Sequence, residues 1–298
     1  MDQAPLSPTA RALASLDGLS MGDAFGERFF GAVESVLPRI RRRELPETEW
    51  PYTDDTEMAL SIVRILRDHQ AVEQDALAQL FAERMSPGRG YGVGAYKVLT
   101  AIQMGGDWRG LSRSGFGGVG SFGNGAAMRV APLGAYFAEL PLPAIAHQAQ
   151  LSAEITHAHP EGIAGAIAVA VAAALACRAS GSSAPLGQAF LEEVRDATPS
   201  GYTWDGIDEA VAVGDASPVE AARALGNGAG VTAPDTVPFC LWVCSRFSHD
   251  FVESMWNTVT ALGDRDTTCA IVGGIVACQT GRAGIPDEWF EHREAIEP

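Results

Sequence analysis

Residues 162–177 read GIAGAIAVAVAAALAC and form the most apolar stretch of the chain. At 16 residues the stretch is shorter than a membrane span requires, and half of it is alanine. Pro160 stands just before it, where the first turn of a helix tolerates proline. We therefore expect a buried core helix in an α-helical protein.

Helical spacing continues along the rest of the chain. Met58, Ile62, Ile65 and Leu66 mark one face of a helix, and alternating strand patterns are almost absent. The expected fold is therefore all-α, a compact single-domain orthogonal helix bundle over residues 1–298 with its core at about 12–284. Further helices are expected at residues 10–19, 76–85, 96–104, 184–198, 207–214, 219–225, 237–247, 251–260 and 269–278, and in a run that begins at Ala126. Loops are expected at residues 30–52 and 105–125.

Composition restricts the function classes. The 298 residues carry a net charge of −16, which repels the nucleic-acid backbone in general. The five cysteines form no CxxC pair, so we expect reduced thiols and a cytoplasmic location. The first residues lack the basic and apolar segments of a signal peptide. No membrane partner is expected.

Two acidic clusters lie far apart in the sequence. They are Thr53-Asp54-Asp55-Thr56 and Asp264-Arg265-Asp266-Thr267, and each precedes an apolar helical run. Each can be a polar helix cap, and Asp54 with Glu57 can form a capping box. Four aspartates that met in space would instead repel one another unless cations held them. Oxygen ligands suit magnesium, calcium or manganese.

A glycine-rich segment at residues 114–125 reads SGFGGVGSFGNG. It is neither a dinucleotide-binding fingerprint nor a P-loop, because it lacks the preceding strand and a following Gly-Lys-Ser/Thr. Its backbone N–H groups can bind a phosphate, and Phe116 and Phe122 can stack on a base. The alternative is a flexible loop with two core aromatics.

Three shorter motifs are ambiguous alone. His157 and His159 would face different ways on a helix, so the simple interpretation is a helix N-terminus with one hydrogen-bonded histidine. The basic run at residues 39–43 is either a solvated loop or a contact for a phosphate or an acidic partner. The glycines of residues 22–26, and the pair at 273–274, permit close packing against another element.

Together these segments resemble the ADP-ribosylglycohydrolase family, in family order and across about residues 12–284. The matching motifs are Gly22-Asp23-Ala24-Phe25-Gly26, Tyr52-Thr53-Asp54-Asp55-Thr56, Gly123-Asn124-Gly125-Ala126-Ala127-Met128-Arg129, Thr156-His157-Ala158-His159 and Gly263-Asp264-Arg265-Asp266-Thr267.

The resemblance implies an all-α fold with a central cleft for two Mg²⁺ ions, for which Mn²⁺ is a possible substitute. The implied metal ligands are Thr53, Asp54, Asp55, Asp264, Asp266 and Thr267. The implied contacts to ADP-ribose are Phe116, Gly120, Ser121, Phe122, Gly123, Asn124, Gly125 and His157. The family usually has threonine where this chain has Arg265, which would contact a phosphate or the target, or offset the acidic cluster.

The resemblance also implies hydrolysis of an N- or O-glycosidic bond at the anomeric carbon of ADP-ribose, attached most readily to a protein target, with nucleic acid as another possibility. Asp55 is the first candidate for the general base, followed by Asp54, Glu27 and Glu34. Two alternatives stay open: a two-metal hydrolase of a free ADP-ribose derivative or nucleotide, and a non-catalytic ADP-ribose binder. A monomer is expected.

Overall fold

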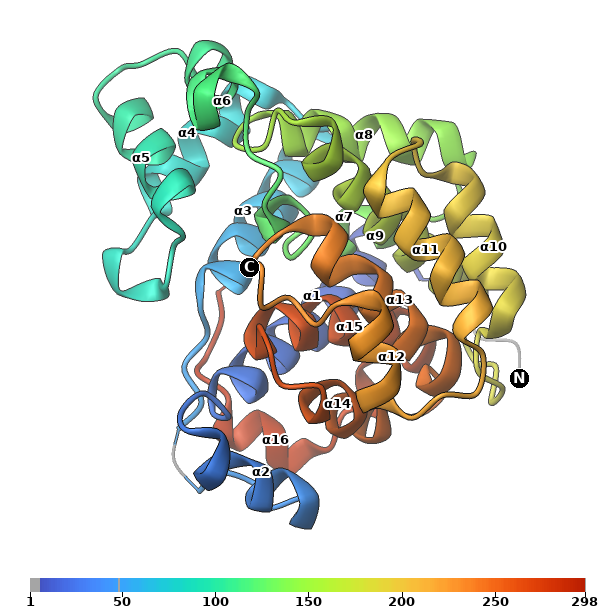
Figure 1. Cartoon of the computed structure of the whole chain (residues 1–298). Coiled ribbons are helices and arrows are strands. Elements are labelled where there is room, and N and C mark those ends of the chain that lie inside the picture. Colours follow the sequence, from blue (N-terminus) through green and yellow to red (C-terminus); the bar gives the residue numbers. More distant parts are fainter. Residues whose placement is uncertain (1–5, 48, 298) are drawn as a thin grey trace.

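The computed structural model describes residues 6–47 and 49–297. Within these residues the regular structure is helical, and β-type pairing is limited to two isolated bridges, Trp50 with Arg293 and Gly123 with Thr232. The all-α prediction is confirmed. The helices are α1 (Pro8–Glu27), α2 (Val33–Arg42), α3 (Asp54–His69), α4 (Gln74–Arg84), η1 (Pro87–Arg89), α5 (Val93–Gln103), α6 (Trp108–Gly118), η2 (Asn124–Ala126), α7 (Ala131–Tyr136), α8 (Leu142–Glu154), α9 (Pro160–Arg178), α10 (Gly187–Ala197), α11 (Tyr202–Val213), α12 (Pro218–Leu225), α13 (Ala233–Phe247), α14 (Phe251–Thr260), α15 (Arg265–Thr280), η3 (Arg282–Gly284) and α16 (Asp287–His292) (Figure 1).

The apolar stretch that opened the sequence lies in α9. This helix is long and apolar enough to cross a membrane by length and composition, yet 83% of its most apolar window is buried inside the protein. It packs against α7, α8, α13 and α15. The expected core helix is therefore confirmed, and alanine suits it because small side chains let several helices approach one another.

The first and last long helices, α1 and α15, lie side by side at the centre of the molecule (Figure 1). Their contact is backbone to backbone. A Cβ atom on Gly22 would stand 2.0 Å from the carbonyl oxygen of Cys269, and one on Gly273 would stand 2.3 Å from that of Gly18. Only glycine fits such an approach. The close packing expected at these glycines is confirmed, and it brings Asp23 beside the start of α15.

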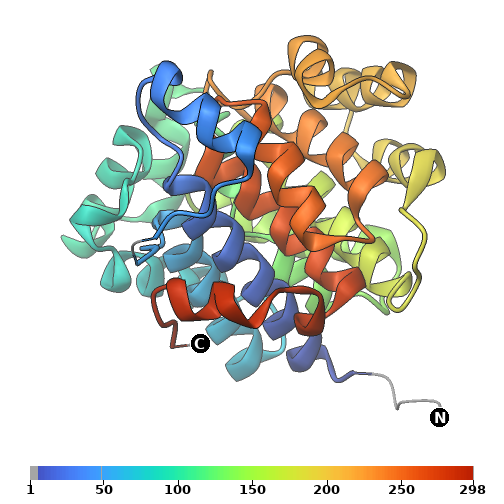
Figure 2. The ribbon, with the colours of Figure 1, turned by 90° about the horizontal axis from the view of Figure 1, so that it is seen from below.

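An aromatic cluster joins the two ends of the chain beneath this helix pair. The Phe25 ring stacks on Trp289 with 5.0 Å between centroids and also contacts Trp50 and Trp256. The backbone N–H of Trp50 donates to the carbonyl of His292 at 2.7 Å. Figure 2 shows α16 lying along this lower face near α1. The cluster therefore anchors the segment that leads into α3.

Two expected loops prove to contain helices. Residues 30–52 include α2, whose buried face consists of Val36 and Ile40, four residues apart. Residues 105–125 include α6, because Asp107 caps its first turn and buried Trp108 donates to Asp75 at 2.8 Å. The apolar faces of these two helices are short and lie among charged or glycine residues, so hydrophobic periodicity did not predict the helices.

Other boundaries also differ from expectation. The helix expected at 10–19 runs on to Glu27, so the motif at 22–26 is helical. The expected run from Ala126 is a 3-10 turn followed by α7, and α8 was not foreseen. The capping box was wrong: the Glu57 carboxylate accepts instead from the N–H of Ser86 and the hydroxyl of Tyr91.

Candidate functional site

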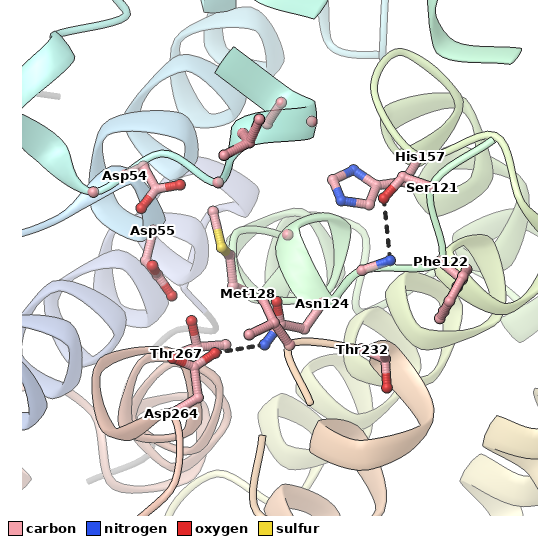
Figure 3. A pocket seen from close by; sticks show the side chains of 18 of the residues that line it. Asp54, Asp55, Ser121, Phe122, Asn124, Met128, His157, Thr232, Asp264 and Thr267 are labelled. Carbon is pink, nitrogen blue, oxygen red and sulfur yellow. Dashed lines mark hydrogen bonds between the residues drawn. The ribbon is translucent and has the colours of Figure 1, made fainter. Parts of the chain in front are cut away.

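A cavity of about 560 Å³ lies where the starts of α3 and α15 face the glycine-rich segment. Figure 3 shows Asp54 and Asp55 on one side, Asp264 and Thr267 below, and His157 and Phe122 opposite. Its lining residues come from segments that are far apart in the sequence. The lining residues are Asp54, Asp55, Met58, Gly90, Gly92, Val93, Gly94, Ala95, Phe116, Ser121, Phe122, Gly123, Asn124, Gly125, Met128, His157, Gly230, Val231, Thr232, Asp264, Asp266 and Thr267.

Asp23 fixes the start of α3 from below the cavity. Its fully buried carboxylate accepts from the N–H and hydroxyl of Thr53, at 2.9 and 2.8 Å, and from the N–H and hydroxyl of Thr56. All of these partners are donors. Burial raises the pKa of Asp23, whereas the hydrogen bonds from Thr56 and Thr53 lower it. Asp23 thus holds the backbone that presents Asp54 and Asp55.

The two acidic clusters of the sequence do meet at this cavity. Asp54 and Asp55 are buried, Asp266 is half-buried, and Asp264 accepts a hydrogen bond from the Asn124 amide at 2.7 Å. Burial, with repulsion from Asp23 and Asp264, raises the pKa of Asp54 to about 7. Burial and neighbouring aspartates raise the pKa values of Asp55 and Asp266 well above the usual range. When they are ionised, these carboxylates therefore repel one another.

This repulsion predicts that stability of the cation-free protein depends on pH. An aspartate with a folded-state pKa raised from 3.8 to about 7 binds more protons folded than unfolded, so its stabilising contribution is lost as pH rises through 7. We expect the free energy of unfolding in EDTA to be about 1–2 kcal/mol higher at pH 6.5 than at pH 8.0. Scanning calorimetry at both values measures it.

The titration of His157 sets the lower limit of the pH range for that measurement. Burial and the charge of Arg129 lower the pKa of His157 to about 3. Below pH 6.5 the unfolded histidine gains protons that the folded one does not, which destabilises the fold and opposes the aspartates. A flat or rising stability between pH 6.5 and 8.0 would contradict the raised pKa values.

The donor set suits hard cations. Oδ1 of Asp55 and Oδ1 of Asp266 are buried without a hydrogen-bond partner in the described chain, and a cation would satisfy both. Oδ2 of Asp55 lies 3.0 Å from the Thr53 hydroxyl. No three acidic, histidine or cysteine side chains of residues 6–47 and 49–297 converge on one point as they stand. Hydroxyl, water or substrate oxygens would therefore complete any coordination shell.

The glycine-rich segment forms the opposite wall. Phe116 follows a break in α6 at a backbone φ of 52°, and its ring is 59% exposed. Phe122 is 39% exposed, with its centroid 6.3 Å from that of Phe116. The Ser121 hydroxyl accepts from the N–H of Gly123 (Figure 3). Two partly exposed rings at a cavity wall are not core residues, so the alternative of two core aromatics is wrong.

The two histidines have different surroundings. His159 is the N-cap of α9, and its Nδ1 accepts from the N–H of Glu161 at 3.1 Å. His157 is buried at the cavity, with Nδ1 2.8 Å from the Thr156 hydroxyl. Its lowered pKa keeps the imidazole neutral at physiological pH. The helix N-terminus expected at this motif is confirmed, with His159 as its cap. Both histidines, and not one, have a hydrogen-bond partner, and His157 also lines the cavity.

Most of the expected site residues line the cavity, and five do not. Thr53 lies just beneath it on Asp23. Gly120 packs against the backbone of His159. Glu27, near the end of α1, is half-buried, and burial and the charge of Asp23 raise its pKa. The fourth is Glu34, which is exposed in the first turn of α2. The fifth is Arg265, whose guanidinium lies over the Phe30 ring.

Sequence reasoning missed part of the cavity wall. Gly90 and Gly92 belong to a segment with glycine at positions 88, 90, 92 and 94, a pattern visible in the sequence. Val231 and Thr232 follow a glycine-rich segment at residues 226–230, which gives no specific signal of a binding role. Met128 is central in Figure 3; it belongs to a recognised motif, but an apolar residue carries no signal of a binding role.

The fold and the site define an all-α protein with an acidic cleft that faces a glycine- and phenylalanine-containing wall. The sequence model of the ADP-ribosylglycohydrolase family matches residues 4–297. The chain therefore belongs to the ADP-ribosylglycohydrolase family.

Individual relatives agree with this assignment. Human ADP-ribosylhydrolase ARH3 is 28% identical over 335 residues, which cover 97% of this chain and 90% of the human protein. A protein of Archaeoglobus fulgidus is 33% identical over 292 residues, covering 92% and 88%. A solved structure titled "ADP-ribosylglycohydrolase-related protein complex" shares the fold with a TM-score of 0.69 at 24% identity, covering 97% and 93%.

Proposed function

We propose that the chain is a magnesium-dependent hydrolase that cleaves the N- or O-glycosidic bond joining ADP-ribose to a target. One observation carries the proposal: carboxylates from two helix starts share a single cavity with a glycine-rich wall and two exposed phenylalanine rings. Family membership supports the substrate class, because relatives over nearly the whole chain are named ADP-ribosylhydrolases.

The acidic side of the cavity would hold the cations and the ribose. The residues that would hold two Mg²⁺ ions are Thr53, Asp54, Asp55, Asp264, Asp266 and Thr267. Bound Mg²⁺ would supply positive charge that orients sugar hydroxyls and favours ionisation of a water. Asn124, which already donates to Asp264 at 2.7 Å, would keep that carboxylate in place.

The general base is proposed to be Asp55 or Asp54. Both line the cavity. Burial and neighbouring carboxylates raise the pKa of both groups, that of Asp54 to about 7, and a base is most effective when its pKa lies near the working pH. Glu34 is exposed on α2 and outside the cavity wall, so the proposal gives it no role. Glu27 lies close enough to Asp23 and Asp264 for their charges to raise its pKa. It is therefore the next candidate for the general base.

The opposite wall would hold the adenosine diphosphate. Phe116 and Phe122 present partly exposed faces on which a purine can stack. The backbone N–H groups and the hydroxyl around Ser121 suit phosphate oxygens. Neutral His157 can donate or accept a hydrogen bond without adding charge.

The decisive experiment presents a panel of defined ADP-ribosylated substrates, with arginine, serine and acidic linkages and free O-acetyl-ADP-ribose, in Mg²⁺ and in EDTA. We expect release of intact ADP-ribose from at least one member and a loss of about 10²-fold or more in EDTA. Products are separated by liquid chromatography. Nucleoside monophosphate as the product would indicate a phosphohydrolase, and calorimetric binding of ADP-ribose without turnover would indicate a binding protein.

A further inference from the structure

Arg265 occupies an unusual position between two carboxylates. It is the first residue of α15, follows the N-cap Asp264 and precedes Asp266. The positive end of a helix dipole disfavours a cation in the first turn. The residue is also only 7% exposed, so its guanidinium is withdrawn from most of the solvent. A charge in this place needs a compensating environment.

That environment is an aromatic ring rather than a carboxylate. Cζ of Arg265 lies 5.1 Å from the centroid of the Phe30 ring, within the range of a cation–π contact. Its Nε is buried without a hydrogen-bond partner among the described residues. Arg265 does not line the cavity. Direct binding of a phosphate in the cavity, one of the roles expected from the sequence, therefore receives no support from this geometry.

The guanidinium nevertheless belongs to the residue that directly adjoins Asp264 and Asp266 at the start of α15, so its charge stands near the acidic cluster. Burial lowers the pKa of Arg265, while the nearby groups Cys269, Asp266 and Asp264 act to raise it. The position is also rigid, because a Cβ atom on Gly26 would stand 2.1 Å from the carbonyl oxygen of Arg265. The end of α1 thus holds the start of α15, and Phe30, just beyond that end, holds the side chain.

We infer that Arg265, held on the Phe30 ring, is a positioning residue that acts as a fixed counter-charge behind the acidic cluster and weakens its affinity for divalent cations. It offsets part of the carboxylate charge without occupying the cavity. The dissociation constant for Mg²⁺ would therefore be higher than it would be with the carboxylates alone. The inference rests on the cation requirement of the proposed function.

The test is calorimetric titration of cation-free, full-length protein with MgCl₂, with no ADP-ribose present. We expect Arg265→Gln to bind Mg²⁺ about tenfold more tightly than the parent, because one nearby positive charge is removed. Arg265→Lys, which keeps the charge, should stay within about threefold. Phe30→Leu should tighten binding by a smaller factor, because the released guanidinium becomes screened by water.

A matched control removes the same charge at the other end of the same helix. Arg282 follows the C-terminus of α15, roughly 25 Å away for 16 residues at 1.5 Å each, so Arg282→Gln should leave Mg²⁺ affinity unchanged. Circular dichroism establishes that each variant is folded.

Three results would overturn the inference in different ways. Unchanged or weaker Mg²⁺ binding by both Arg265→Gln and Phe30→Leu, with a parent that binds Mg²⁺, would refute the counter-charge alone. A parent that binds no Mg²⁺ would refute the counter-charge together with the cation requirement of the proposed function. Equal tightening in Arg265→Gln and Arg265→Lys would also refute it, because the charge would then not be the cause.

Discussion

Asp55→Asn is expected to lower kcat/KM for ADP-ribose release by about 10²–10³-fold and at the same time to raise the melting temperature of the cation-free protein. Asp55 is fully buried, its Oδ1 has no partner, and burial and repulsion from Asp23, Asp266 and Asp54 raise its pKa. Neutralising it would remove a proposed cation ligand and relieve that repulsion. The repulsion thus lowers stability at the proposed catalytic site.

The rise in melting temperature should be about 2–4 °C in EDTA, which corresponds to about 1 kcal/mol in a domain of this size. Scanning calorimetry and a product-release assay measure the two effects. Asp68→Asn is the matched control, because Asp68 lies on the same helix, 40% exposed and paired with Arg64. It should change neither quantity appreciably. An Asp55→Asn protein that is active, or clearly less stable in EDTA, would contradict the assignment.

Asp23→Ala is expected to lower the free energy of unfolding by about 3 kcal/mol or more, because it leaves the buried N–H groups of Thr53 and Thr56 without acceptors. Activity should fall by about 10–100-fold in the folded fraction, as when the support of a metal ligand is lost. Urea denaturation and Mg²⁺ calorimetry measure the two losses. The sequence motif alone marked Asp23 only as a neighbour of glycines.

Two comparisons make the Asp23 result interpretable. Asp23→Asn keeps the shape but turns an amide N–H toward donors, so it should lose stability while retaining more activity than Asp23→Ala. Asp17→Ala, on the same helix and paired with Arg293 at 3.3 Å, should lose little stability and no activity. An Asp23→Ala protein with parental stability would show that the hydrogen bonds to residues 53–56 do not hold the start of α3.

Much of the fold was predictable because it is encoded locally. The apolar run of α9 and the spaced faces of α3, α13, α14 and α15 repeat at the helical period, and all appear in the structure. The failures at α2 and α6 share one physical cause. In α2 the helix is secured by only two buried side chains, and in α6 by a cap and one buried tryptophan, so neither produces a long periodic signal.

In the candidate site, too, some features are encoded locally and others depend on tertiary contacts. The chemistry of its parts was readable: carboxylates at helix starts, glycines before aromatic rings, and a histidine beside a threonine. The assignments that failed or were missed depend on tertiary neighbours. Glu57 caps no helix because it accepts from Ser86 and Tyr91. The wall at Gly90 and Val231 joins the cavity only through folding.

By itself the sequence determined the helical class and the family, because these follow from local periodicity and from residue types in a fixed order, and it predicted a set of oxygen ligands. Only the tertiary structure decided that Gly22 meets the backbone of Cys269, which sets the distance between the two acidic clusters. It also decided that Arg265 rests on Phe30 and not in the cavity. Helix crossing distance and side-chain direction depend on packing between distant segments, which local spacing does not record.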